Sequence, residues 1–230
     1  MKCLTTLVAA SLAASTLSCA AFADITNFRD WMDANGVATN STSNTWYGTT
    51  GVGGSLLAPV TNSNGSYWSG QFASGTPVLA LAANVGSYAG AAGPATFNGS
   101  WIHTAPSVAT VLVFQPSQAT YATGMNVRSE LIANGLSGNG ISISVSTVIG
   151  GVTTNRGTTT LVGTTADQLD FFAFGSGVTL GVGDKVMISF GDRGDYNFDH
   201  ANFNAWLAVP APGALALLAA VGLLSHRRRD

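Results

Sequence analysis

The stretch Gly138-Asn-Gly-Ile-Ser-Ile-Ser-Val-Ser-Thr-Val148 decides the fold class. After the Gly-Asn-Gly turn signal, apolar and hydroxyl side chains alternate strictly, which predicts a half-buried strand over residues 141–148. Gly150 and Gly151 then predict a tight turn into a second strand over residues 152–162. We therefore expect a β-hairpin formed by these two strands.

Short strands separated by Gly, Asn and Ser clusters are predicted on both sides of this hairpin. One short helix is expected near residues 27–34, capped by Thr26 and ended by Gly36, with Phe28, Trp31 and Met32 on one face. Ten or more short strands in a segment of this length predict an all-β sandwich of jelly-roll type. The expected strands cover residues 55–61, 66–72, 77–82, 95–104, 108–115, 125–132, 169–174, 177–180, 185–190 and 196–207.

The composition of residues 24–208 excludes several functions. This segment has five basic and ten acidic residues, a net charge of −5, so no basic stripe is available for nucleic acid. Its single glutamate, Glu130, follows Arg128 in an alternating strand, which we interpret as a solvated face. A glycosidase needs two carboxylates with separate roles, and a zinc site needs Cys or paired His, which this segment lacks. We therefore expect no enzyme.

Residues 1–23 have the pattern of a secretory signal peptide, with Lys2 before an Ala- and Leu-rich apolar run. Ala21-Phe-Ala23 is an A-x-A cleavage site, which predicts a mature start at Asp24. Both cysteines, Cys3 and Cys19, lie inside this segment, so the mature domain depends on its core rather than on disulfides. A lipoprotein signal at Cys19 is the less favoured alternative, because Leu17 stands one place from the required position.

Residues 209–230 combine a Pro-containing motif, an apolar run and a basic end. The 12 apolar residues 213–224 would reach about 18 Å as a helix, which is short for a bilayer core of about 30 Å. The arginines are expected to stay on the cytoplasmic side. The segment is thus either a plain membrane anchor or a sorting signal removed after export. Its marker residues are Val209, Pro210, Ala211 and Pro212 in the motif, and Arg227, Arg228 and Arg229 at the end.

This tail resembles the PEP-CTERM sorting signal of Gram-negative and related bacteria. In that family a Val-Pro-Glu-Pro motif precedes a short apolar helix and an Arg cluster. Here Ala211 stands in the position of the Glu. The resemblance implies export to the cell envelope or outer surface, transient anchoring in the bacterial membrane, and processing by the membrane protease exosortase.

Residues 101–207 resemble the β-sandwich domains that often precede this tail, which are similar to carbohydrate-binding modules. The matching motifs are Gly-Asn-Gly at 138–140, Val-Gly-Asp-Lys-Val at 182–186 and Gly-Asp-Tyr-Asn-Phe-Asp at 194–199. The resemblance implies binding of extracellular polysaccharide.

Aromatic rings flanked by polar residues are candidates for stacking on a sugar. Trp46 and the pair Tyr67-Trp68 are such positions, whereas Trp101 and Trp206 are interpreted as core. Neighbours in a strand point to opposite faces, so one ring of each aromatic pair, Trp46-Tyr47 and Tyr67-Trp68, is expected in the core.

One acidic stretch is a candidate metal site. Asp195, Asn197 and Asp199 alternate, so on a strand their oxygens would share one face and could hold calcium, with Asp184 or Asp192 completing the ligands. The alternative is a hairpin in which Tyr196 and Phe198 pack inside. No cofactor is otherwise expected.

Two functions follow from the sequence. The first is an exported cell-surface or matrix protein that binds exopolysaccharide, and the second is a structural or adhesive envelope protein without a specific ligand. An aromatic row exposed on one sheet face would favour the first, and complete burial of the tryptophans would favour the second.

Overall fold

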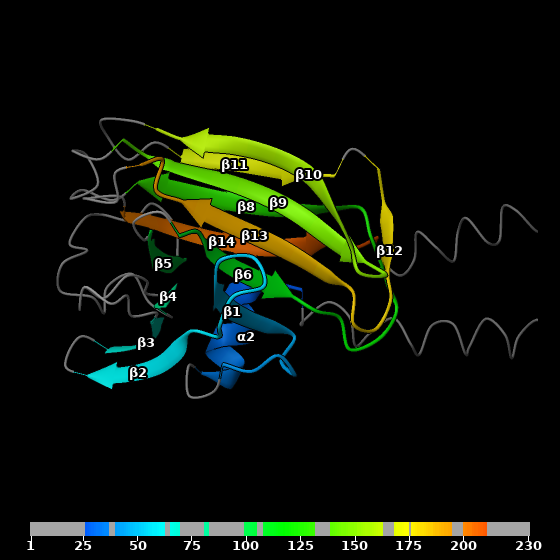
Figure 1. Cartoon of the computed structure of the whole chain (residues 1–230), viewed down its shortest axis with the longest axis horizontal. Coiled ribbons are helices and arrows are strands. Elements are labelled where there is room, and N and C mark those ends of the chain that lie inside the picture. Colours follow the sequence, from blue (N-terminus) through cyan, green and yellow to red (C-terminus); the bar gives the residue numbers. More distant parts are fainter. Residues whose placement is uncertain are drawn as a thin grey trace, which may run out of the picture.

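The computed structural model describes residues 26–36, 40–62, 65–69, 81–82, 99–104, 108–131, 139–162, 168–174, 176–194 and 200–210. These residues form two facing antiparallel sheets, a small two-stranded sheet and one helix, α2 (Figure 1). The predicted all-β sandwich is confirmed. Within the described part of the chain, no helix has the length and apolar character needed to cross a membrane.

The predicted hairpin forms one edge of the smaller sheet. Its first strand keeps the predicted alternation, with Ile141, Ile143 and Val145 buried and the serines between them half-buried. The strands of this sheet, in spatial order, are β1 (Trp46–Thr50), β6 (Thr110–Phe114), β13 (Lys185–Gly191), β9 (Ile141–Ile149) and β10 (Val152–Leu161).

The larger sheet combines the two halves of the chain. It includes the predicted strands near 125–132 and 196–207 as neighbours, and it reaches to the short strands of the first half. Its order is β11 (Gln168–Ala173), β8 (Gly124–Leu131), β14 (His200–Ala208), β5 (Ser100–His103), β4 (Leu81–Ala82), β3 (Gly65–Ser69) and β2 (Ala58–Asn62). At one end of the sandwich, β7 (Thr120–Ala122) pairs with β12 (Val178–Leu180).

The helix α2 (Phe28–Asn35) confirms the predicted position and ends at Gly36, whose φ is 67°. Its cap is Asn27 rather than Thr26: the Asn27 Oδ1 accepts from the backbone N–H groups of Arg29 and Asp30. Thr26 has a different task, because its carbonyl accepts a bond of 3.0 Å from the Leu207 N–H of β14. The first residue of the described chain is therefore held beside the last strand.

The core joins both sheets to the helix through aromatic rings. The Phe28 ring lies 5.5 Å from Trp46 of the smaller sheet and 5.7 Å from Phe203 of the larger one, measured between centroids. Trp68 is a further neighbour at 6.2 Å. Burial of such large apolar surfaces is the main source of stability in a domain without disulfides.

Candidate functional site

The outer face of the larger sheet carries polar and aromatic side chains from β8, β11 and β14. In β8 and β14 the core residues stand at alternate positions, such as Val127 in β8 and Ala205 in β14. The residues between them therefore point away from the core. Strand pairing aligns these outward residues in rows across the sheet.

One row is open to solvent and contains Phe172, Asn126 and Trp206. Asn126 of β8 pairs with Phe172 of β11 on one side and with Trp206 of β14 on the other. Phe172 is 54% exposed, and the other two side chains are half-buried. We call these three residues the aromatic row. It presents two rings with an amide between them, and the ring positions are two strand spacings, or about 10 Å, apart.

The glycine at the start of β8 gives the Phe172 ring its place. A Cβ on Gly124 would stand 2.2 Å from Cζ of Phe172, which means that this ring lies directly over the bare backbone. The ring is thus held close to the sheet, although the side chain is 54% exposed. An exposed aromatic ring fixed in this way loses little conformational freedom when a ligand stacks on it.

Hydrogen-bonding groups stand directly beside the aromatic row. Arg128 and Asn204 pair with each other in the next outward row, and both are half-buried. The Asn204 Oδ1 accepts from the Ala205 N–H at 2.9 Å, which fixes the orientation of the amide. A guanidinium and two amides therefore flank two aromatic rings on a rigid sheet.

The third row is buried and has a structural role. Asn202 of β14 lies between Glu130 and Trp101, and its Nδ2 donates to Glu130 Oε1 at 2.7 Å. Glu130 and Asn202 are fully buried, and Trp101 is buried as predicted. The interpretation of Glu130 as part of a solvated face is therefore wrong, because its carboxylate is held against an amide inside the molecule.

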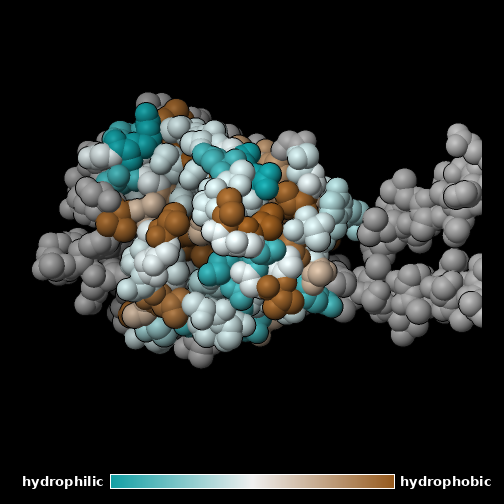
Figure 2. All heavy atoms as spheres, turned by 45° about the vertical axis from the view of Figure 1, so that its right-hand side comes forward, coloured by the Kyte–Doolittle hydropathy of each residue, from teal (hydrophilic) through white to brown (hydrophobic). Residues whose placement is uncertain are grey.

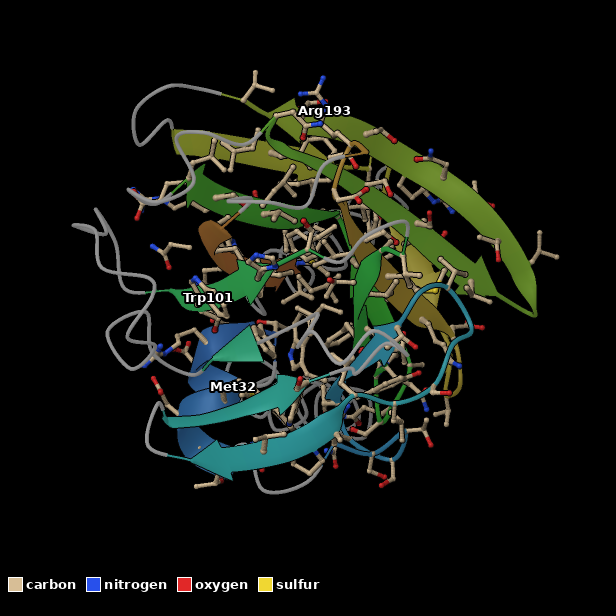
Figure 3. The ribbon with its side chains drawn as sticks, turned by 60° about the vertical axis from the view of Figure 1, so that its left-hand side comes forward. Met32, Trp101 and Arg193 are labelled. Atoms are coloured by element: carbon tan, nitrogen blue, oxygen red, sulfur yellow. The ribbon has the colours of Figure 1, made fainter. Side chains whose placement is uncertain are left out.

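Next to this row, His103 lies with its ring centroid 6.1 Å from that of Trp101, and its Nδ1 is 2.6 Å from the Thr104 carbonyl oxygen. Burial lowers the pKa of His103, because the charged imidazolium is desolvated there. Figure 3 shows Trp101 between the helix that carries Met32 and the upper region that carries Arg193.

Two of the predicted sugar-binding rings are in the core. Trp46 and Trp68 are both fully buried around Phe28, so neither offers a face to a ligand, and that prediction is wrong. Tyr67 is in β3, but its side chain lies outside the described residues and stays a prediction. Trp206, expected in the core, is instead half-buried on the outer face.

Most of the predicted metal site lies outside the described residues. Asp195, Asn197 and Asp199 lie outside the described residues, so calcium binding stays a prediction. Asp184 precedes β13 and Asp192 follows it, so these two candidate further ligands stand at opposite ends of a seven-residue strand of about 23 Å. Their part in a metal site stays a prediction. Within the described residues, no group of three His, Cys, Asp or Glu could hold a metal ion.

Most residues of the predicted export signals also lie outside the described residues. Ala21, Ala23 and Asp24 precede the described residues, and the tail follows them from Ala211 onward. Val209 and Pro210 are described and half-buried directly after β14.

No protein-family model matches the chain, and no curated protein sequence matches it. Similar solved structures include SpGH29, at 10% identity over 50% of this chain and 23% of that chain, with a TM-score of 0.33. The family 32 CBM from C. perfringens NanJ in complex with galactose is 14% identical over 47% of this chain and 77% of its own, with a TM-score of 0.33. CBM51 from Clostridium perfringens GH95 in complex with methyl-galactose is 16% identical over 70% and 92%, with a TM-score of 0.29. The chain thus spans less than a quarter of the SpGH29 chain.

Proposed function

We propose that this is an exported cell-surface or matrix protein that binds extracellular polysaccharide on the outer face of its larger sheet. The observation that carries the proposal is the aromatic row, in which Phe172 is 54% exposed and aligned with Asn126 and Trp206. A ring face stacks on the apolar face of a pyranose, while amides and hydroxyls bond the sugar oxygens. The row supplies both kinds of contact.

The arrangement suits an extended chain rather than a single sugar. The two ring positions are about 10 Å apart across the strands, so two separate sugar units of a linear polymer could stack on them. Arg128 and Asn204 lie on one side of that line, where they can bond hydroxyl or carboxylate groups of the polymer.

The two ends of the sequence support export and sorting. The proposed signal peptide, residues 1–23, would carry the chain across the inner membrane, and the proposed sorting tail, residues 209–230, would hold it there until exosortase acts. Mass spectrometry of the C-terminus from the native host tests this: an intact Arg229-Asp230 end would leave only a plain anchor.

Binding can be tested by affinity electrophoresis of the full chain in gels that contain soluble polysaccharides. Phe172→Ala should abolish retardation by any polysaccharide that retards the parent protein. Tyr121→Ala is the matched control, because Tyr121 is also an exposed aromatic but belongs to the two-stranded sheet of β7 and β12. Equal retardation of the parent and Phe172→Ala would remove the aromatic row as the site.

The second candidate function is a structural or adhesive envelope protein. It is favoured by the burial of Trp46, Trp68 and Trp101, since a tryptophan inside the protein cannot stack on a ligand. Lack of retardation by every polysaccharide tested would support it.

A further inference from the structure

One end of the sandwich carries exposed apolar side chains that the polysaccharide site does not use. Val182 stands in the turn before β13 and is 74% exposed, and Val152 follows the turn between β9 and β10 and is 67% exposed. Asp184 holds the two turns together: its carboxylate accepts from the Gly150 N–H at 2.9 Å and from the Gly181 N–H at 2.7 Å. The two valines therefore project from neighbouring turns that the hydrogen bonds of Asp184 join.

The chain leaves the domain at the same end. The Thr123 N–H, between β7 and β8, donates to the carbonyl of Ala208, the last residue of β14. The preceding residue, Ala122, pairs with Val178 of β12, and β12 leads directly into the turn that contains Val182. In Figure 1, β12 and the turn between β9 and β10 lie together at the right-hand end, toward which β14 runs.

The chain that follows is apolar. After Val209 and Pro210 the sequence continues through the apolar residues 213–224 to the three arginines. A segment of that composition partitions into a bilayer or its interface. Figure 2 shows that apolar side chains reach the surface of this side in separate groups among polar ones.

We propose that this end, with Val152 and Val182 foremost, rests against the lipid surface while the tail is inserted. The inference rests on the membrane-bound tail of the proposed function. Contact at this end would set the orientation of the domain, with β13 rising from the bilayer and Arg193 about 23 Å away at its other end.

The test uses the full chain in vesicles of phosphatidylcholine and phosphatidylglycerol, with Cys3 and Cys19 replaced by Ser. Single cysteines replace Val152, Val182, Arg193 or Ala216 in turn and carry an environment-sensitive fluorophore. Apolar groups at the interface penetrate by about 5–10 Å, so brominated lipid chains should quench the labels at 152 and 182 at least about twofold more than the label at 193.

The outcomes distinguish contact of this end with lipid from insertion of the tail. Quenching at 216 with equal, weak quenching at 182 and 193 would overturn the contact and leave the inserted tail intact. Lack of quenching at 216 would overturn the inserted tail, and with it the contact. A further variant separates contact from mere nearness to the tail: Val152→Asp should weaken quenching at 182, and unchanged quenching there would also overturn the proposal.

Discussion

Replacing Asn40 by Ala should destabilise the protein, although this half-buried residue lies outside the helix and strands. The Asn40 side chain behaves like a neighbouring strand for Gly48 of the edge strand β1: its Oδ1 accepts from the Gly48 N–H at 3.0 Å, and its Nδ2 donates to the Gly48 carbonyl at 2.7 Å. The same Nδ2 donates to the Leu57 carbonyl at 2.9 Å. One side chain thus joins two segments to the sandwich edge.

The magnitude follows from these three bonds. Each contributes about 0.5–1.5 kcal/mol net, and a buried donor left without its partner costs about 1–3 kcal/mol. Gly48 and Leu57 are buried, so we expect Asn40→Ala to lower the free energy of unfolding by about 2–3 kcal/mol. For a domain of this size, that corresponds to a fall in Tm of roughly 5–10 °C.

Urea unfolding monitored by tryptophan fluorescence measures the effect, provided that the m-value stays constant. Asn40→Asp should be no better than Ala at neutral pH, because its carboxylate would face two carbonyl oxygens. Ser41→Ala is the matched control, since its hydroxyl bonds only the exposed Ser43 hydroxyl and backbone. If Asn40→Ala matches Ser41→Ala to within about 0.5 kcal/mol, these three bonds contribute nothing of consequence and the reasoning fails.

Three further outcomes are expected. The backbone bonds from Gly150 and Gly181 lower the pKa of Asp184. The stability that this carboxylate contributes is therefore present above its unfolded pKa of about 3.9 and is lost as the pH falls through the lower folded value. The difference in Tm between the parent and Asp184→Ala should shrink at low pH, and a constant difference down to pH about 2 would refute this prediction. Burial lowers the pKa of His103, so the folded state takes up a proton less readily than the unfolded state. Stability should therefore fall as the pH drops below about 6.5 in the parent but not in His103→Gln. Identical profiles of stability against pH for the two proteins would contradict this prediction. Gly124→Ala should lower the free energy of unfolding by about 1–3 kcal/mol, because the added Cβ collides with the Phe172 ring. Urea unfolding should show that this loss is largely removed when Phe172→Ala is also present. Additive losses from the two substitutions would argue against the collision.

The hairpin over residues 141–162 was predictable because its sequence signals are local. Alternation over residues 141–148 and the Gly150-Gly151 turn predict two strands and the turn between them, and the structure confirms them as β9 and β10. The pairing shifts register between Asn155 and Gly157, which the sequence pattern did not predict. The helix was predictable for the same reason. Its cap was assigned to the wrong residue because the pairing of Thr26 with Leu207 depends on the folded chain.

The candidate site was much harder to predict from the sequence. Alternation shows that Trp46 and Tyr47 point to opposite faces but not which face another layer covers, and both are buried. The aromatic row requires Asn126 to pair with residues far along the chain, Phe172 and Trp206. A local signal did exist in the outward alternation of Asn202, Asn204 and Trp206, but it became meaningful only beside β8.

The position of β14 has a mechanical consequence. This strand carries Trp206 of the proposed ligand site and continues directly into the tail, and it is paired with β8 at eight positions and with β5 on its other side. If a polymer held at the aromatic row pulls against an anchored tail, the load acts along β14 in shear, so the ladder bonds on both sides resist it together rather than opening one by one. The domain would then transmit tension between a matrix and the envelope through a strand that is paired on both sides.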